Sequence, residues 1–448
     1  MRIVGNDPTL SRQITATASG AISAAGKPLI VNTDGTVAVA GDIAPSAGSE
    51  AVILSNDVGG YSSLIYAGDN TQTTNDADKV IIVFKDPTNS NYGTAVVGTV
   101  SGTSISFGSK VVFESAEISP VVCCMDSTQG KVGIFYQDNG NSHYGTGVVG
   151  TVSGTSISFG TPSVFESANT IHLSCDFDDA TGKILVGYAD FGNSGHGTAI
   201  VATISGTSLS YGSAAVFNAA NTQKVSVAYD PNANRFLISY RDLGNSNYGE
   251  AVVATISSTS VSYGSAVVFS SANTDHVTSI CDTTNNKVVV GYNVSGINKA
   301  IVGTLDASST DVSFGSEATV HTNTAYFHSN RGLAYDPDTG RVLAAYLDST
   351  DASHGKIALG TVSGTSISFD TPFKFNAGTT YYVGAAYNKG TDNFVVIFED
   401  YGNSGYLTSI VIDGGGNNLT TENFIGTSAH SAADGAKVLV NTQGAIDE

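Results

Sequence analysis

The chain has 448 residues, a formal net charge of −20 and only 13% charged residues, and it contains 51 glycines and no tryptophan. This charge argues against a protein that binds the nucleic-acid backbone or docks on anionic membrane. With 41% hydrophobic residues the chain can bury a core, and its Gly-, Ser-, Thr- and Val-rich composition favours strands and tight turns over helices.

The N-terminal stretch MRIVGNDPTLSRQITATASG lacks the apolar core of a signal peptide. No run approaches the ~20 consecutive apolar residues that a membrane-spanning helix needs. We therefore expect no membrane insertion, and either a cytoplasmic protein or one that leaves its cell by a route other than Sec. The segment SAAGKPLIVNTDGTV from Ser23 is similar to SAADGAKVLVNTQGAI from Ser431, so both are predicted to be hairpin-like and to pack together.

An internal repeat dominates the middle of the chain. GTVSGTSISFG occupies Gly98–Gly108 and returns unchanged at Gly150–Gly160, and related copies begin at Ala202, Ala254 and Gly360. A second marker keeps the same step of 52 residues: Asp86, Asp138, Asp190 and Asp242. A constant step of this length is typical of stacked units of one architecture.

One unit, from Thr170 to Ala220, shows the predicted strands. IHLSCDF, ILVGYAD, TAIVATIS and LSYGSAAVF are short apolar or alternating stretches, and the turn-forming segments DDATGK, FGNSGHG and SGTS separate them. Four antiparallel strands in each of seven units predict an all-β fold, a seven-bladed β-propeller of four-stranded blades. The hairpins of second and third strands are expected to begin near Lys79, Lys131, Lys183, Phe236, Lys287, Arg341 and Phe394.

The last hairpin is followed by no fourth strand. GSEAVILSND at Gly48–Asp57 resembles GSAAVFNAAN at Gly212–Asn221, so the N-terminal region is predicted to supply the missing outer strand and close the ring. The predicted domains are an N-terminal β-hairpin or attachment segment (1–47), the propeller (48–416) and a C-terminal β segment similar to the first (417–448). The two terminal segments are expected to lie outside the ring.

Four cysteines are predicted to be buried free thiols: Cys123, Cys124, Cys175 and Cys281. No CxxC occurs and no Cys/His cluster has zinc spacing. Adjacent Cys123 and Cys124 must point to opposite faces of a strand, which disfavours a disulfide framework. We expect no cofactor and no metal site.

The loop between the second and third strands is the main candidate for binding. It reads DNGNSHYG from Asp138, DFGNSGHG from Asp190 and DLGNSNYG from Asp242. The corresponding loop of the fifth unit, from Asn293, lacks the motif. Aromatic faces beside amides suit sugar recognition, because C–H surfaces stack on rings while hydroxyls form hydrogen bonds. The predicted glycan contacts are Tyr92, Tyr144, His196, Tyr248, His354, Tyr406, Asn141, Asn193, Asn245 and Asn403.

Other interpretations of these loops stay open. Asp and Asn before Gly are ordinary turn formers, so their repetition is also explained by a turn that every blade needs. Calcium is a further alternative, although each loop offers a single carboxylate. His172, His276 and His328 fall near the central channel, where a histidine is commonly a structural residue.

The repeats GTVSGTSISFG…VVFESA resemble those of virion structural and tail-fibre-like proteins of bacteriophages, particularly marine and cyanobacterial ones, over roughly residues 80–412. The terminal NFIGTSAHSAADGAKVLVNTQGAID is similar to a short module of the same kind of protein. The resemblance implies a virion component, assembled in the host cytoplasm, whose expected partners are other virion proteins and further copies of itself.

The predicted function is therefore a non-enzymatic phage tail or fibre component that binds a host-surface glycan or receptor. No GxSxG, HExxH or P-loop pattern points to an enzyme. A secreted, extracellular lectin-like adhesin of a bacterium is the alternative, followed by a propeller glycan hydrolase.

Overall fold

The structure is a computed structural model that describes residues 12–18, 22, 28–31, 35–39, 45–68, 76–327, 331–415, 424–428, 431, 433 and 436–442. The chain divides into two compact units, one formed by Met1–Ser46 with Gly414–Glu448 and the other by Ala47–Asp413. The second unit contains all of the 52-residue repeats. Among the described residues, no helix has the length and apolar character that a bilayer crossing requires.

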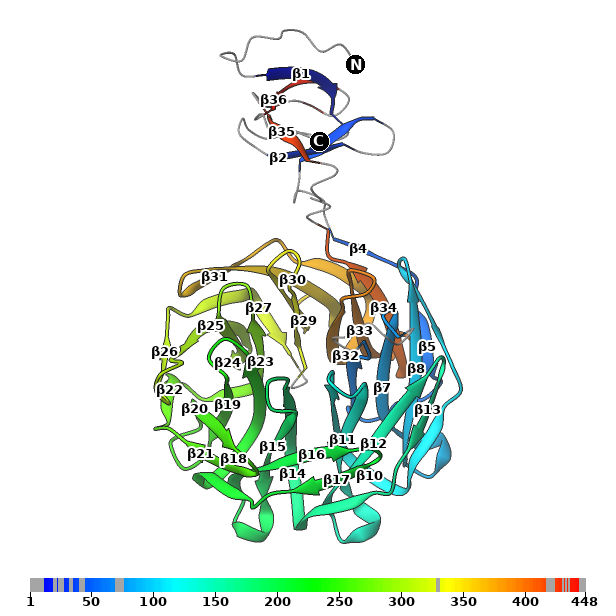
Figure 1. The fold of residues 1–448 in the computed structure, drawn as a ribbon. Helices are drawn as coiled ribbons and strands as arrows, with labels where there is room; N and C mark the ends of the chain where they lie inside the picture. Colours follow the sequence, from blue (N-terminus) through cyan, green and yellow to red (C-terminus); the bar gives the residue numbers. More distant parts are fainter. Residues whose placement is uncertain are drawn as a thin grey trace. The chain divides into compact units, whose positions relative to one another are not determined.

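Strand pairing groups the second unit into seven antiparallel sheets, which Figure 1 shows arranged as the blades of a ring. In the first blade, β6 (Ser62–Tyr66), β7 (Lys79–Asp86) and β8 (Tyr92–Ser101) follow one another outward. The outer strand is broken in two: β9 (Ser104–Phe107) and the first half of β10 (Val111–Asp126) both pair with β8.

The other blades repeat this order. The second to fourth blades add β11 (Lys131–Asp138), β12 (Tyr144–Ser153), β13 (Ser156–Phe159), β14 (Ser163–Asp178), β15 (Lys183–Asp190), β16 (His196–Ser205), β17 (Ser208–Tyr211), β18 (Ala215–Asp230), β19 (Arg235–Asp242), β20 (Tyr248–Ser257), β21 (Ser260–Tyr263) and β22 (Val267–Ser270). The fifth to seventh blades add β23 (Thr274–Asp282), β24 (Lys287–Val294), β25 (Ile297–Leu305), β26 (Val312–Phe314), β27 (Ala318–Tyr326), β28 (Leu333–Asp336), β29 (Arg341–Asp348), β30 (His354–Ser363), β31 (Ser366–Phe369), β32 (Phe373–Asn388), β33 (Asn393–Asp400) and β34 (Tyr406–Asp413). Short 3-10 turns follow some second strands: η1 (Pro87–Asn89), η2 (Asn139–Asn141), η3 (Phe191–Asn193) and η4 (Tyr401–Asn403).

The prediction of a separate outer strand and a separate inner strand is wrong in several blades. β14 is one strand of 16 residues, whose first half pairs with β12 of the second blade and whose second half pairs with β15 of the third. β10, β18 and β32 cross between blades in the same way. In β14 and β18 no glycine or proline interrupts the segment, so the chain has no reason to turn where it leaves one sheet for the next.

The repeated residues build the core between blades. Tyr136, Tyr188, Tyr240, Tyr292 and Tyr346 stand at equivalent positions of successive second strands and are fully buried. Their hydroxyls need partners once buried, and Tyr136 donates to Glu114 on the outer strand over 2.8 Å. Burial raises the pKa of Tyr136, so it stays a neutral donor.

The ring closes with strands from both ends of the unit, as predicted. β5 (Ala51–Leu54) pairs antiparallel with β34, which brings Ala51 opposite Ser409 and Leu54 opposite Leu407. β4 (Ser46–Ala47) lies beside β34 as well. Leu54 and Leu407 are buried in one cluster with residues of the first blade. The closure therefore removes the free edge that the seventh blade would otherwise expose.

The glycine that ends the SISFG segment marks a contact between blades. A Cβ placed on Gly160 would lie 1.8 Å from the carbonyl oxygen of Thr207, in the hairpin turn of the next blade. Gly48, on the closing strand, approaches Thr103 of the first blade in the same way. The sixth blade carries Asp370 there instead, because the seventh blade takes its outer strand from the N-terminal region and has no such hairpin turn.

The other unit contains one sheet built from both ends of the chain, in the order β1 (Arg12–Thr17), β36 (Lys437–Thr442), β35 (Phe424–Ser428), β2 (Pro28–Val31), β3 (Val37–Val39). β2 and β3 form an antiparallel hairpin, and β35 pairs with both β2 and β36. The predicted association of the two terminal segments is confirmed by this shared sheet.

All four cysteines are buried free thiols, as predicted. Cys123 packs in the cluster shared with the first blade, and Cys124 in the cluster shared with the third, so the two point to opposite faces of β10. Burial raises the pKa of the Cys123 thiol to about 11, which keeps it protonated and unreactive.

Candidate functional site

The aspartates of the repeated loops serve as caps of their own backbone. Asp138 accepts from the amide of Asn141 over 3.1 Å, and Asp190 accepts from the amide of Gly192 over 2.8 Å. Asp242 accepts from Gly244, at 2.7 Å. In the fifth blade, where the motif is lost, Asn293 accepts from the amide of Gly296 over 2.9 Å. The turn, rather than a ligand, therefore accounts for these carboxylates.

The ten predicted glycan contacts lie around these loops. The Tyr and His residues begin the third strand of their blades and are half-buried, whereas Asn141, Asn193, Asn245 and Asn403 are exposed. The side chain of Asn245 donates to Glu250 over 2.6 Å. In the sixth blade His354 is held by Asp351, 3.2 Å away, and by the Lys374 ammonium, at 3.0 Å. These contacts restrain part of the predicted set, and the role of the set in glycan binding stays a prediction.

A different feature marks the same end of the blades, closer to the centre of the ring. The inner strands carry a β-bulge near their first residues, with register shifts between Ile171 and Ser174 and between Gln223 and Ser226, for example. The bulged residues have left-handed backbone: φ is 55° at His172, 54° at Lys224, 50° at His276 and 50° at Tyr382. A bulge re-aims the side chain that it displaces, here away from the sheet and toward the centre.

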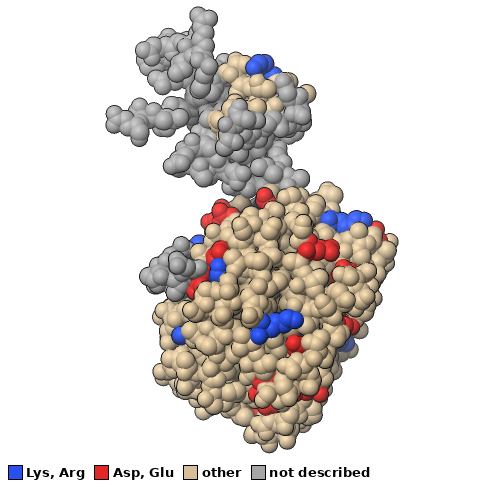
Figure 2. All heavy atoms as spheres, turned by 90° about the vertical axis from the view of Figure 1, so that its right-hand side faces the viewer, with Lys and Arg blue, Asp and Glu red and all other residues tan. Residues whose placement is uncertain are grey.

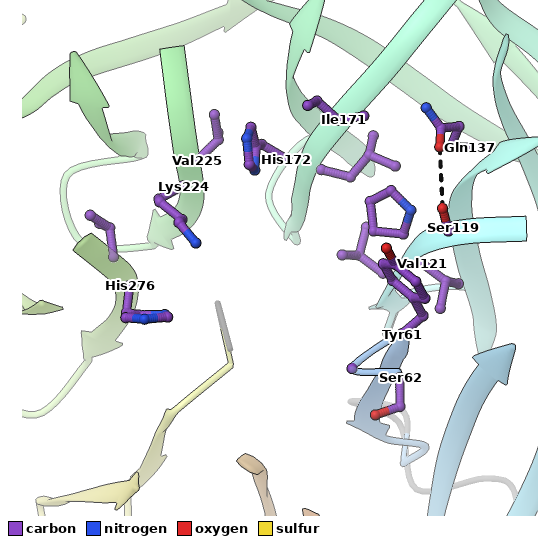
Figure 3. A pocket seen from close by; sticks show the side chains of 15 residues that line it. Tyr61, Ser62, Ser119, Val121, Gln137, Ile171, His172, Lys224, Val225 and His276 are labelled. Carbon is purple, nitrogen blue, oxygen red and sulfur yellow. Dashed lines mark hydrogen bonds between the residues drawn. The ribbon is translucent and has the colours of Figure 1, made fainter. Parts of the chain in front are cut away.

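The bulged segments surround a cavity of about 380 Å³, which we call the mouth cavity. Figure 3 shows Lys224, His172 and His276 reaching into the same space that Tyr61 borders from the first blade. The described residues that line it come from five blades: Gly60, Tyr61, Ser62, Ser119, Pro120, Val121, Val122, Gln137, Ile171, His172, Leu173, Lys224, Val225, His276 and Val277. This lining contains none of the ten residues predicted around the loops.

Polar groups of the mouth cavity are fixed by their neighbours. Ser119 donates to the side-chain oxygen of Gln137 over 3.3 Å, and Gln137 donates to Asn169 over 2.6 Å. The His276 ring packs on the Tyr326 ring, with 5.9 Å between their centroids. The cavity is therefore preformed on strand backbone rather than on free loops.

Charge in the mouth cavity is concentrated on one ion pair. The Lys224 ammonium lies 3.3 Å from the Asp275 carboxylate, and Asp275 is also 3.8 Å from Nε2 of His276. Burial raises the pKa of Asp275, but His276 and Lys224 outweigh that effect and hold it below its usual value. Burial together with the Lys224 charge lowers the pKa of His172 to about 4, so this imidazole is neutral at pH 7.

A pair of carboxyl groups, Glu399 and Asp57, lies beside the cavity at the seam where the ring closes. Glu399 is 1% exposed and accepts from the amide of Gly60 over 2.6 Å. Asp57 accepts from the Tyr401 hydroxyl and, over 2.6 Å, from the amide of Gly59. Burial and the neighbouring Asp57 raise the pKa of Glu399 to about 8, so Glu399 is protonated at neutral pH.

A second cavity, of about 330 Å³, is lined by the later part of the inner strands. Arg331 donates there to the carbonyl oxygen of Cys123. Asp176 is half-buried, and it accepts from the amides of Tyr229, over 2.8 Å, and Phe177, over 2.9 Å. These polar side chains are bound to backbone atoms, so this cavity offers a ligand less than the mouth cavity does.

The described residues show neither a cluster of metal ligands nor, on the face seen in Figure 2, a charged patch that would mark another site. In the described part of the chain, no group of three or more His, Cys, Asp or Glu is placed to hold a metal ion. On the side of the propeller drawn in Figure 2, Lys and Arg (blue) and Asp and Glu (red) are few and scattered among uncharged residues. The mouth cavity is therefore the best-defined candidate site.

The fold defines the chain as a β-propeller protein with a cavity at one mouth of its ring. No protein-family model and no curated protein matches it. Among solved structures it is similar to the BP39L lectin from Burkholderia pseudomallei, with 11% identity, 81% of this chain and 97% of that chain covered, and a TM-score of 0.57. It is also similar to the Cps50 (Swd1) β-propeller domain of Myceliophteria thermophila, with 8% identity, 82% and 99% covered, and a TM-score of 0.53. These similarities confirm the predicted propeller fold and concern the fold alone.

Sequence reasoning found the residues that repeat and missed the site that does not. Sequence reasoning passes over Tyr61, Lys224 and Asp275, because none of the three belongs to a repeated motif. The sequence predicts His172 and His276 near the channel but favours a structural role for them, and His328 lies outside the described residues. The signal that was available is the variation itself: the position six residues before Asp126, Asp178, Asp230, Asp282 and Asn388 holds Pro, His, Lys, His and Tyr in turn.

Proposed function

We propose that the propeller binds a saccharide in the mouth cavity, without catalysing a reaction on it. One observation carries the proposal: a position that lines the mouth cavity holds Pro120, His172 and Lys224 in three successive blades, while the scaffold around it is nearly the same in every blade. A ring that needed only to be stable could repeat one residue there, as it does at the buried tyrosines of the second strands.

The chemistry of the lining suits a sugar. The Tyr61 ring and the apolar side chains of Ile171 and Val225 offer surfaces for C–H groups, and His172, Lys224 and Gln137 offer hydrogen-bonding groups for hydroxyls. A volume of about 380 Å³ lies near the lower end of the ~300–1,000 Å³ range of small-molecule sites, which suits one or two sugar units.

A hydrolase is the less favoured alternative. Glycosidases bring two carboxyl groups to the scissile bond, one of them free to give its proton. The carboxyls beside the cavity are Glu399, which is 1% exposed and bound to Gly60, Asp57, which is bound to Tyr401 and Gly59, and Asp275, which is paired with Lys224. Glu399 and Asp57 hold the seam and Asp275 is held by an ammonium, which supports binding over catalysis.

We further propose that the protein belongs to a phage particle, where it meets a host-surface glycan. The resemblance of its repeats to those of phage virion proteins supports this proposal, and a bacterial adhesin is the alternative. Mass spectrometry of purified particles from a lysate that produces the protein would detect the chain in the virion fraction. Its presence only in the non-particle fraction would contradict the virion assignment.

A glycan array tests the binding, with His172→Ala as the site variant. His143→Ala is the matched control, because His143 is exposed in a loop and, like His172, has left-handed backbone, with φ of 64°. We expect the wild type and His143→Ala to bind the same subset of glycans, and His172→Ala to bind it at least about tenfold more weakly. Absence of wild-type binding to every glycan would overturn the proposal, and release of a shortened glycan would overturn its non-enzymatic part.

A further inference from the structure

Among the described residues at the mouth cavity, Lys224 and Asp275 form a lysine–carboxylate pair. The two residues come from neighbouring inner strands, β18 and β23, and their charged atoms are 3.3 Å apart. Lys224 lines the cavity, and Asp275 directly precedes the lining residue His276. Their side chains are 31% and 41% exposed, so both remain accessible to a ligand.

The pair leaves hydrogen-bonding capacity unused. An ammonium has three donors, and a carboxylate has about four acceptor positions. Asp275 takes one donor of Lys224 and accepts from the amide of His276 over 2.9 Å. A donor and an acceptor therefore remain side by side at the edge of the cavity.

We propose that this pair binds the vicinal hydroxyls of a neutral saccharide, one per ring. Each hydroxyl of a diol both donates and accepts, so two adjacent hydroxyls can accept from Lys224 and donate to Asp275 at the same time. Charge-assisted hydrogen bonds of this kind are the stronger class. The inference rests on the proposed saccharide binding and specifies its substrate class and stoichiometry.

The surroundings favour a neutral ligand over an acidic one. Asp275 already balances the charge of Lys224, and the neutral His172 adds no positive charge. An acidic sugar would bring a second carboxylate next to Asp275, in a protein whose net charge is −20. Like charges at this range repel, whereas a hydroxyl bears no such cost.

One ligand per ring follows from the variation between blades. At the described positions that correspond to Lys224, the other blades carry Tyr61, Pro120, His172, His276 and Tyr382. Among these described positions Lys224 is the one lysine, and its carboxylate partner occurs in the fifth blade alone. The repeated loops, in contrast, would predict several equivalent sites.

The test uses an array of neutral, uronic-acid-bearing and sulfated oligosaccharides, followed by calorimetry with the neutral oligosaccharide that binds most strongly. We expect neutral glycans to dominate, with one bound per chain. Asp275→Asn keeps the shape and the acceptor for His276 but loses the charge, and we expect it and Lys224→Gln each to weaken binding at least about tenfold. Asp179→Asn and Lys131→Gln, at the opposite end of the blades, are the matched controls and should bind like the wild type.

The outcomes separate the inference from the proposed function. Three outcomes would overturn the inference and leave saccharide binding in place. They are glycan binding that Asp275→Asn does not affect, binding restricted to acidic glycans, and a stoichiometry of several glycans per chain. Wild-type protein that binds no array glycan would overturn both. Circular dichroism and melting curves of the two variants check that their fold is retained, and His172→Ala provides an independent measure of the cavity should either variant unfold.

Discussion

The loop ring and the mouth cavity lie at the same end of the blades but are built on opposite principles. In the loops, Asp138, Asp190 and Asp242 perform the same capping in blade after blade. In the cavity, one position holds Pro120, His172 and Lys224 in three successive blades. The difference teaches that residues repeated in every blade of a propeller serve the stability of the ring. Residues that vary at one shared position indicate a surface that serves binding instead.

The largest effect is expected from opening the ring, on which both regions depend. Deleting residues 1–58 removes β5 and exposes the edge of β34, so we expect aggregation or a melting temperature lower by more than about 10 °C. Deleting residues 1–44 leaves β4 and β5 in place and should preserve the propeller transition. Calorimetry of both deletions measures this, and equal melting of the two would contradict the role of β5.

A repeated glycine gives the next largest effect. Gly160→Ala places a methyl group against the Thr207 carbonyl, and overpacking of this kind costs about 1–3 kcal/mol of the free energy of unfolding. The control is Ser158→Ala, two residues earlier on the exposed face of β13, and a change within about 0.5 kcal/mol is expected there. Urea unfolding measures both, and an unchanged free energy for Gly160→Ala would show that the blades shift apart at little cost.

The seam beside the mouth cavity is expected to depend on pH. The raised pKa of Glu399, about 8 against 4.5, means that the folded state holds a proton that the unfolded state releases, so stability falls as pH rises from 4.5 to 8. Glu399→Gln removes this cost while keeping the acceptor for Gly60. Its stabilisation should be small at pH 5 and grow by up to ~1.4 kcal/mol for each pH unit towards pH 8.

Asp57 does not change stability over the same pH range as Glu399. Burial raises the pKa of Asp57, but hydrogen bonds from Glu399 and Tyr401 outweigh that effect and hold the pKa below its usual value. The stability that Asp57 contributes is therefore present above its usual pKa and is lost only in acid. Melting temperatures of the wild type and Glu399→Gln between pH 5 and pH 8 test the prediction. A difference that does not change with pH would mean that Glu399 is ionised in the folded protein.

The smallest effect is expected from the loop ring itself. Tyr144 and Tyr248 are half-buried at the start of third strands and do not line the mouth cavity. Replacing both by Ala should lower glycan avidity by less than about threefold, because each peripheral contact contributes little. Surface plasmon resonance on an immobilised array glycan measures it. A loss of tenfold or more with the fold intact would make the loop ring the ligand face, acting through multivalency.

The sequence by itself determined the period, the strand order, the closure by residues near Gly48–Asp57 and the free thiols. Each of these follows from local physics: alternation selects strands, Gly and Asp select turns, and adjacent residues of a strand face opposite ways. A constant step of 52 residues then leaves few ways to stack the units. The continuous strand β14 escaped this reasoning because the change of sheet within it has no turn residue to mark it.

Only the tertiary structure decided where the mouth cavity lies and which residues share it. Tyr61, His172, Lys224 and His276 are separated by about fifty residues or more, and nothing local relates them. They meet because the ring brings the start of these inner strands to one centre, and because a bulge turns His172, Lys224 and His276 inward. The ion pair between Lys224 and Asp275 exists for the same reason, since neighbouring blades place β18 beside β23.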